Sequence, residues 1–111
     1  MLSIILCADD YAISPGVSKG ILKLVDADRL SATGCMTASP YWPEYAENLT
    51  HYADKIDVGI HLTLTDQVPL GVLPYTAPGN KFPSMGMLLK KSLTGKLDLL
   101  EIRQEVQRQI D

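Results

Sequence analysis

Three short apolar segments alternate with two amphipathic ones, and this alternation constrains the fold more than any other feature. Segments 2–8, 31–37 and 56–64 predict strands, because each is a short run of apolar and β-branched residues bounded by turn-forming residues. Segments 15–26 and 43–53 place apolar residues at helical spacing and predict helices. A β-α-β-α-β order favours a parallel sheet with right-handed crossovers. The sequence therefore indicates the α/β class, built from parallel β/α units.

The third predicted strand carries a histidine near its end. Residues 58–65 alternate strictly between aliphatic side chains and others. Because successive side chains of a strand point to opposite faces, His61 shares one face with Gly59 and two threonines. Ligands and catalytic groups of α/β proteins collect at this end of a strand. His61 is therefore either a candidate metal ligand or a hydrogen-bonded core histidine, and this strand alone does not decide between the two.

Two adjacent carboxylates, Asp9 and Asp10, end the first apolar segment. On a strand their side chains point to opposite sides, so they can take different roles. Ser14 and Pro15 form a good helix start, so the pair can also simply begin the connecting loop. Combined with His61 at the end of another parallel strand, however, the two carboxylates form a credible set of metal ligands.

Three motifs support a family resemblance. They are Ala-Asp-Asp-Tyr-Ala-Ile-Ser-Pro-Gly-Val at 8–17, Leu-Ser-Ala-Thr at 30–33 followed by Met36 and Pro40, and Gly-Ile-His-Leu-Thr-Leu-Thr at 59–65. In this order they resemble the YdjC-like carbohydrate deacetylases, a family that includes the chitooligosaccharide deacetylases. Ala12 departs from the family, which usually has glycine there. This turn must therefore form without a residue suited to positive φ.

The resemblance implies a distorted (β/α) barrel of about twice this length. Residues 1–111 would then form the N-terminal part of a single deacetylase domain, equivalent to the first half of the barrel-like fold. The family continues into a further strand that supplies another histidine ligand, and this chain stops at Asp111 before reaching it. Residues 99–106 resemble the helix that leads into that strand, so we expect a domain that is incomplete at its C-terminus.

The chemistry implied by the resemblance is metal-dependent removal of N-acetyl groups from amino-sugar oligosaccharides. Asp10, His61 and a later histidine would hold a divalent ion that polarises the acetyl carbonyl and lowers the pKa of a bound water. Asp9 would accept the proton of that water as general base. Mixed nitrogen and oxygen ligands favour Zn²⁺, whereas related proteins are often associated with Mg²⁺, so both ions stay open.

A long loop is expected to face the substrate. Residues 66–83 contain four prolines and two glycines, which exclude regular structure. A loop of this length after a ligand-bearing strand often contacts substrate, although it can also be a mobile connector. The candidate substrate-binding residues are all aromatic: Tyr11, Trp42, Tyr75 and Phe82. Segments 84–93 and 98–110 predict helices, and the second has an apolar stripe at residues 99, 102, 106 and 110 that needs a partner.

Composition excludes several classes of function. The net charge of −3 and the lack of a lysine/arginine cluster argue against nucleic-acid binding. No apolar run is long enough to span a membrane, and the first residues lack the basic region of a signal peptide. Cys7 and Cys35 both fall in predicted buried strands, which favours reduced thiols and a cytoplasmic protein.

Three functions compete at this point. The leading one is a carbohydrate deacetylase, and the second is a metal-dependent hydrolase of another amide or ester. The third is a non-catalytic remnant that folds by self-association. A half barrel would leave a sheet edge unpaired and apolar helix faces uncovered, so we expect a homo-oligomer.

Overall fold

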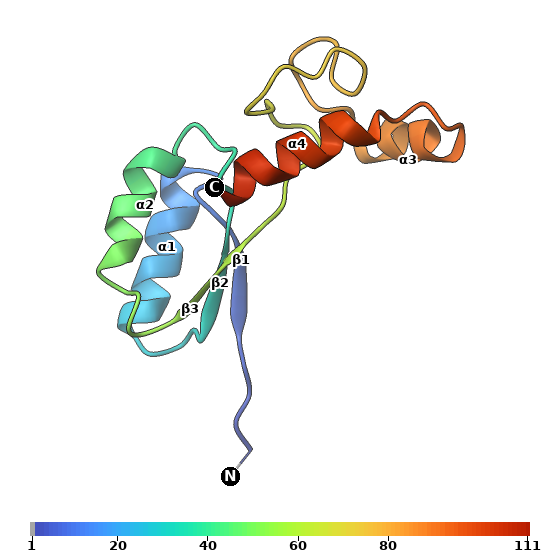
Figure 1. The fold of residues 1–111 in the computed structure, drawn as a ribbon. Coiled ribbons are helices and arrows are strands. Elements are labelled where there is room, and N and C mark those ends of the chain that lie inside the picture. The colour runs from blue at the N-terminus through green and yellow to red at the C-terminus, as the bar shows by residue number, and fades with distance from the viewer. Residues whose placement is uncertain (1) are drawn as a thin grey trace. The chain divides into compact units, whose positions relative to one another are not determined.

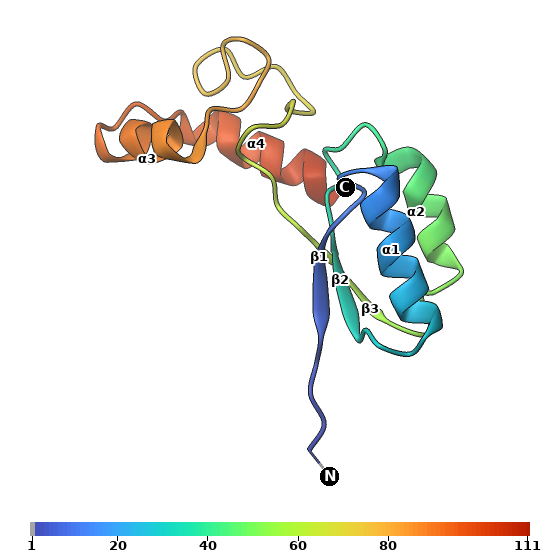
Figure 2. The same cartoon turned by 180° about the vertical axis from the view of Figure 1, so that it is seen from behind.

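The computed structural model describes residues 2–111, which form two compact units, one ending at His61 and the other spanning Leu62–Asp111. Figures 1 and 2 show the ribbon from opposite sides. The first unit contains the sheet and two helices, and the second contains a long loop followed by two helices. Each unit is described by itself.

The first unit has the predicted order of strands and helices. Its elements are β1 (Cys7–Tyr11), α1 (Pro15–Asp26), β2 (Ala32–Cys35), α2 (Trp42–Thr50) and β3 (Asp57–Ile60). The strands form one sheet in the order β1-β2-β3, and both neighbouring pairs are parallel. Both helices lie on the same side of the sheet (Figures 1 and 2). The α/β class and the parallel β/α units are therefore confirmed.

Helix α1 has the bounds that the sequence predicts. It begins after Ser14, whose hydroxyl accepts a hydrogen bond from the Val17 N–H at 3.3 Å, with a proline in the first turn. Its buried face consists of Ser18, Ile21 and Val25. Val17, another apolar residue of this helix, is exposed instead. The buried face is rotated toward Ser18 because the hydroxyl of that residue bonds to the backbone of Ala12.

Strand β1 differs most from its prediction. It begins at Cys7, opposite Ala32 in β2, and runs through both aspartates to Tyr11. Residues 2–6 are exposed and lie outside the strand, because β2 has no strand residue opposite them. Cys7, the first residue of β1, is exposed, so its expected burial is wrong, whereas Cys35 is buried as predicted. Strand β3 is also shorter than predicted and ends at Ile60, directly before His61.

The second unit contains α3 (Met85–Leu93) and α4 (Leu99–Ile110), as the sequence predicts. A small core of Leu73, Ala77 and Phe82 holds the loop that precedes them. The predicted apolar stripe of α4 is not its buried face. Leu99 and Ile110 are exposed, and the buried side chains are Glu101, Glu105 and Gln109. Among residues 2–111, no helix combines the length and the apolar character needed to cross a membrane.

Candidate functional site

Asp10 and His61 come together at one end of the sheet. The Oδ1 atom of Asp10 lies 3.0 Å from Nδ1 of His61, and the Asp10 N–H donates to the same nitrogen at 3.3 Å. These residues were predicted at matching strand ends, and the structure brings them within ligand distance of one point. The side chains of His61 and Asp10 are 36% and 48% exposed. The pair is therefore open to solvent and to a ligand.

This geometry suits a divalent cation. When Nδ1 is deprotonated, its single lone pair either accepts the Asp10 N–H or, with the carboxylate oxygen beside it, faces a cation. Two donor atoms 3.0 Å apart can both bind one ion at about 2.1 Å, a usual distance for zinc. When Nδ1 carries a proton, the same contact lets Asp10 orient the imidazole instead. Within residues 2–111, no cluster of three or more histidine, cysteine or acidic residues could hold a metal ion.

The Asp9 carboxylate lies on the same side of the sheet as His61. A Cβ atom added at Gly34, in the central strand, would lie 3.0 Å from Oδ1 of Asp9 and 3.4 Å from the Cβ of His61. Asp9 and His61 therefore border the same space beside the central strand. Asp10 has φ +67° and the β1–β2 register is irregular at this point, which breaks the alternation of the strand. Asp10 contacts the imidazole, and the Asp9 carboxylate borders the space next to the His61 Cβ.

Gly34 lies in the predicted strand 31–37 and was not among the predicted site residues. In the structure it leaves the space that the Asp9 carboxylate and the His61 side chain border. Its place in the second strand, between one ending in aspartates and one ending in histidine, was the signal that could have identified it.

The turn after Asp10 forms with alanine in a left-handed conformation. The Ile13 N–H donates to the Asp10 carbonyl at 3.0 Å, and Ala12 has φ +72°. This is the conformation for which glycine is favoured and which the family resemblance implies here. The structure thus shows how the chain departs from the family without changing the path of the turn.

Tyr11 does not contact substrate in this arrangement. Its side chain has no exposed surface, and its hydroxyl donates to the carbonyl of Tyr45 at 2.9 Å. The two rings pack edge to face, with centroids 6.1 Å apart. Burial, with smaller contributions from Cys35 and neighbouring tyrosines, raises the pKa of Tyr11 to about 12. Tyr11 is therefore a core residue that directly follows Asp9 and Asp10 in the chain.

The other aromatic candidates differ in accessibility. Phe82 is 2% exposed and belongs to the small core of the second unit, so it offers no face to a sugar. Trp42 is half-buried and lines an apolar groove with Leu49 and Val58. Tyr75 is 70% exposed in the loop of the second unit. Trp42 and Tyr75 therefore keep a surface for a ligand, and their contact with substrate stays a prediction.

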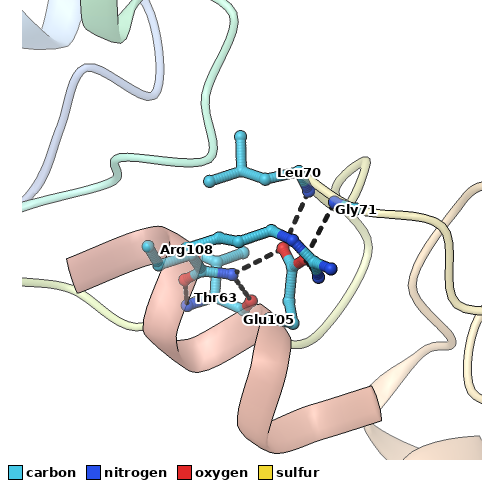
Figure 3. Close-up of polar contacts among 6 residues, drawn as sticks. Thr63, Leu70, Gly71, Glu105 and Arg108 are labelled. Carbon is cyan, nitrogen blue, oxygen red and sulfur yellow. Dashed lines mark hydrogen bonds and ion pairs between the residues drawn. The ribbon is translucent and has the colours of Figure 1, made fainter. Parts of the chain in front are cut away.

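The polar face of α4, defined as Glu101, Glu105 and Gln109, was missed by sequence reasoning. Glu105 accepts hydrogen bonds from the N–H groups of Leu70 and Gly71 at 2.8 and 3.0 Å (Figure 3). The Gln109 amide accepts the Thr63 N–H at 2.9 Å and donates to the Thr63 carbonyl at 2.8 Å. The Glu-x₃-Glu-x₃-Gln spacing, which places all three on one helix face, was the available signal.

Glu101 repeats this contact one turn earlier in the helix. Its carboxylate accepts the N–H groups of Tyr75 and Thr76 at 3.1 and 2.8 Å. Lys91 of α3 donates to the carbonyls of the same two residues at 3.0 and 3.2 Å. Burial raises the pKa of Glu101, but hydrogen bonds donated by Thr76 and Tyr75 outweigh it and leave the pKa below the ordinary value. The loop backbone is therefore fixed by buried side chains.

The fold and the site together define a class. Parallel β/α units that carry acidic and imidazole side chains at the carboxyl ends of their strands are typical of α/β proteins with ligand sites at that edge. The chain belongs to the YdjC-like protein family, whose sequence profile matches residues 3–111.

Named relatives agree with this assignment. The chain is 30% identical over 107 residues to a chitooligosaccharide deacetylase of Serratia marcescens. It is 29% identical over 108 residues to a carbohydrate deacetylase of Enterococcus faecalis. In both cases the match covers 96% of this chain and 41% of the relative, so the chain spans less than half of their length.

A solved structure has a similar fold. The chain superimposes with a TM-score of 0.77 and 26% identity on a crystal structure from Enterococcus faecalis V583, provisionally described as a cellobiose-phosphate cleavage protein. The superposition covers 96% of this chain and 41% of the other. The three-stranded parallel sheet thus corresponds to a part of a larger β/α fold.

Proposed function

We propose that this chain provides the Asp-Asp-His part of the active site of a metal-dependent carbohydrate deacetylase. The observation that carries the proposal is the 3.0 Å approach of Asp10 to His61 beside Asp9. Relatives named as carbohydrate and chitooligosaccharide deacetylases support the substrate class, which is N-acetylated amino-sugar oligosaccharides.

Each of the three residues has a distinct role in this proposal. Asp10 and His61 hold a divalent ion, either Zn²⁺ or Mg²⁺, through one oxygen and one nitrogen. When bound, such an ion polarises an amide carbonyl and lowers the pKa of water. Asp9 accepts the proton of the attacking water, because its carboxylate is exposed and borders the same space as His61. Trp42 and Tyr75 offer flat apolar faces for sugar rings.

The direct test is acetate release from N,N′-diacetylchitobiose by a complete version of the protein that also supplies the later histidine ligand, with Zn²⁺ or Mg²⁺ added. The proposal requires acetate and a partly deacetylated disaccharide whose glycosidic bond is intact. An N-acyl amino acid and a simple acetyl ester serve as comparison substrates. Faster hydrolysis of either one would assign the site to another amide or ester. Zn²⁺ and Mg²⁺ titrations that show no binding at His61 would contradict the metal-dependent mechanism itself.

A further inference from the structure

Ala12 is held in a conformation that alanine rarely adopts. Its φ is +72°, two residues after Asp10, which has φ +67° itself. An L-residue with a Cβ is strained in this left-handed region, and glycine is not. Because Ala12 is also completely buried, water cannot compensate its backbone groups. Something in the surrounding protein must therefore hold this residue in place.

Two serine hydroxyls bond to the backbone of Ala12. Its N–H donates to the hydroxyl of Ser18, in α1, at 3.0 Å. The Ser18 hydroxyl in turn donates to the carbonyl of Ser14 at 2.9 Å, which fixes the direction of its lone pairs. The hydroxyl of Ser39, between β2 and α2, donates to the carbonyl of Ala12. Both serines are buried, so two separate segments satisfy both polar groups of one strained residue.

The conformation of Ala12 is linked to the placement of Asp10. The Asp10 carbonyl accepts the Ile13 N–H at 3.0 Å across the turn that contains Ala12. The Tyr11 carbonyl between them accepts the Met36 N–H at 2.9 Å. A rotation of Ala12 out of the left-handed region would break this turn, because the chain could no longer reverse between these bonds. The Asp10 carboxylate would then lose its position beside His61.

We propose that Ser18 and Ser39 are positioning residues that hold Ala12 left-handed and thereby keep Asp10 beside His61. This inference rests on the proposed function insofar as Asp10 and His61 bind a metal ion. Neither serine is among the residues assigned to the ion or to a substrate. Their effect is exerted through the backbone of the turn, as is usual for groups that orient metal ligands.

The experiment compares Ser18→Ala and Ser39→Ala with Ser31→Ala as a matched control. Ser31 also accepts a backbone N–H, that of Leu6 at 3.3 Å, but it lies away from the turn. Zn²⁺ is titrated into each protein, and binding is followed by NMR at the His61 imidazole. We expect Ser18→Ala and Ser39→Ala to weaken Zn²⁺ binding about tenfold or more, and Ser31→Ala to leave it unchanged. Wild-type affinity in folded Ser18→Ala and Ser39→Ala would overturn the inference.

Rescue separates positioning from a general loss of stability. Glycine at position 12 adopts positive φ without strain, so Ala12→Gly in the Ser18→Ala background is expected to recover most of the Zn²⁺ affinity. An affinity that stays low in the folded double variant contradicts the inference. If Ser18→Ala does not fold, Ser39→Ala and its double variant with Ala12→Gly provide the same comparison. A Zn²⁺ affinity that stays low in that folded double variant would contradict the inference.

A second measurement is independent of metal. In the absence of Zn²⁺, Ser18→Ala must accelerate hydrogen exchange at the Ala12 amide and shift the resonances of Asp10 and His61, and Ser31→Ala must not. If the wild-type protein binds no Zn²⁺ but Ser18→Ala causes these changes, the proposed function fails and the positioning role stands. If Zn²⁺ binds at His61 and the changes are absent, the positioning role fails alone.

Discussion

Asp10 and His61 are 51 positions apart in the sequence, and their side chains approach to 3.0 Å between Oδ1 and Nδ1. Parallel pairing of β1 and β3 with the central strand brings both strand ends to the same edge. The left-handed backbone of Asp10 then turns its carboxylate toward the imidazole. The contact therefore depends on the sheet topology and on one unusual dihedral angle.

Substitutions of the two aspartates are expected to separate metal binding from proton transfer. Asp10→Asn should weaken Zn²⁺ binding about tenfold or more, because it removes an anionic ligand from the pair. In a complete, active version of the protein, Asp9→Asn should leave metal content nearly intact and abolish acetate release, because an amide cannot accept the proton of the water. Metal analysis of both purified variants, with an acetate assay, measures both effects. Loss of metal only in Asp9→Asn would reverse the two roles.

The polar face of α4 is expected to contribute strongly to the stability of the second unit. Glu105→Ala leaves the N–H groups of Leu70 and Gly71 without their acceptor, and hydrogen bonds to a charged group contribute about 2 kcal/mol to stability. Urea denaturation should show a loss of about this size or more. Gln104→Ala, on the exposed side of the same helix, is the control and should change the free energy of unfolding by less than about 0.5 kcal/mol. Equal effects of the two substitutions would show that the carboxylate does not hold the loop.

Much of the framework could be predicted from the sequence. Helix α1 matches its prediction from the capping serine to its last residue, because a cap, a proline and apolar spacing all indicate the same boundaries. His61 and Asp10 were predicted as a pair because parallel strand ends share one edge. Both inferences used local patterns that tertiary packing did not override.

The remaining features depend on tertiary contacts that have no local signature. In the sequence, Glu101 and Glu105 resemble solvated helix residues. Their burial is favourable because loop N–H groups, which have no other acceptor in a helix or strand, donate to their carboxylates. Ser18 likewise lies on a helix face that apolar periodicity did not select. Cys7 is exposed although it lies in β1 opposite the first residue of β2, so the apolar pattern alone did not decide its burial.

Acid is expected to loosen the contact between Glu101 and the loop. Because the folded-state pKa of Glu101 lies below its ordinary value of 4.5, the carboxylate contributes stability that is fully present above that pH. The contribution is lost as the pH falls below 4.5 and through the lower folded-state pKa. Urea midpoints measured from pH 7 to pH 3 should therefore converge for the wild type and Glu101→Gln. A difference that stays constant over this range would show that the carboxylate is not the group responsible.

The exposed apolar side chains at the start of the described chain are expected to cause self-association. Leu2, Ile4 and Ile5 are 96%, 78% and 80% exposed and directly precede β1, an edge strand of the sheet among residues 2–111. An extended apolar segment beside an unpaired strand edge favours pairing with a second copy. Light scattering after size exclusion should show a mass that rises with protein concentration, and Ile4→Lys with Ile5→Lys should lower it toward the monomer. Val17→Lys, at an exposed apolar position of α1, is the control and should leave the association unchanged. A monomer at every concentration would show that these side chains do not mediate association.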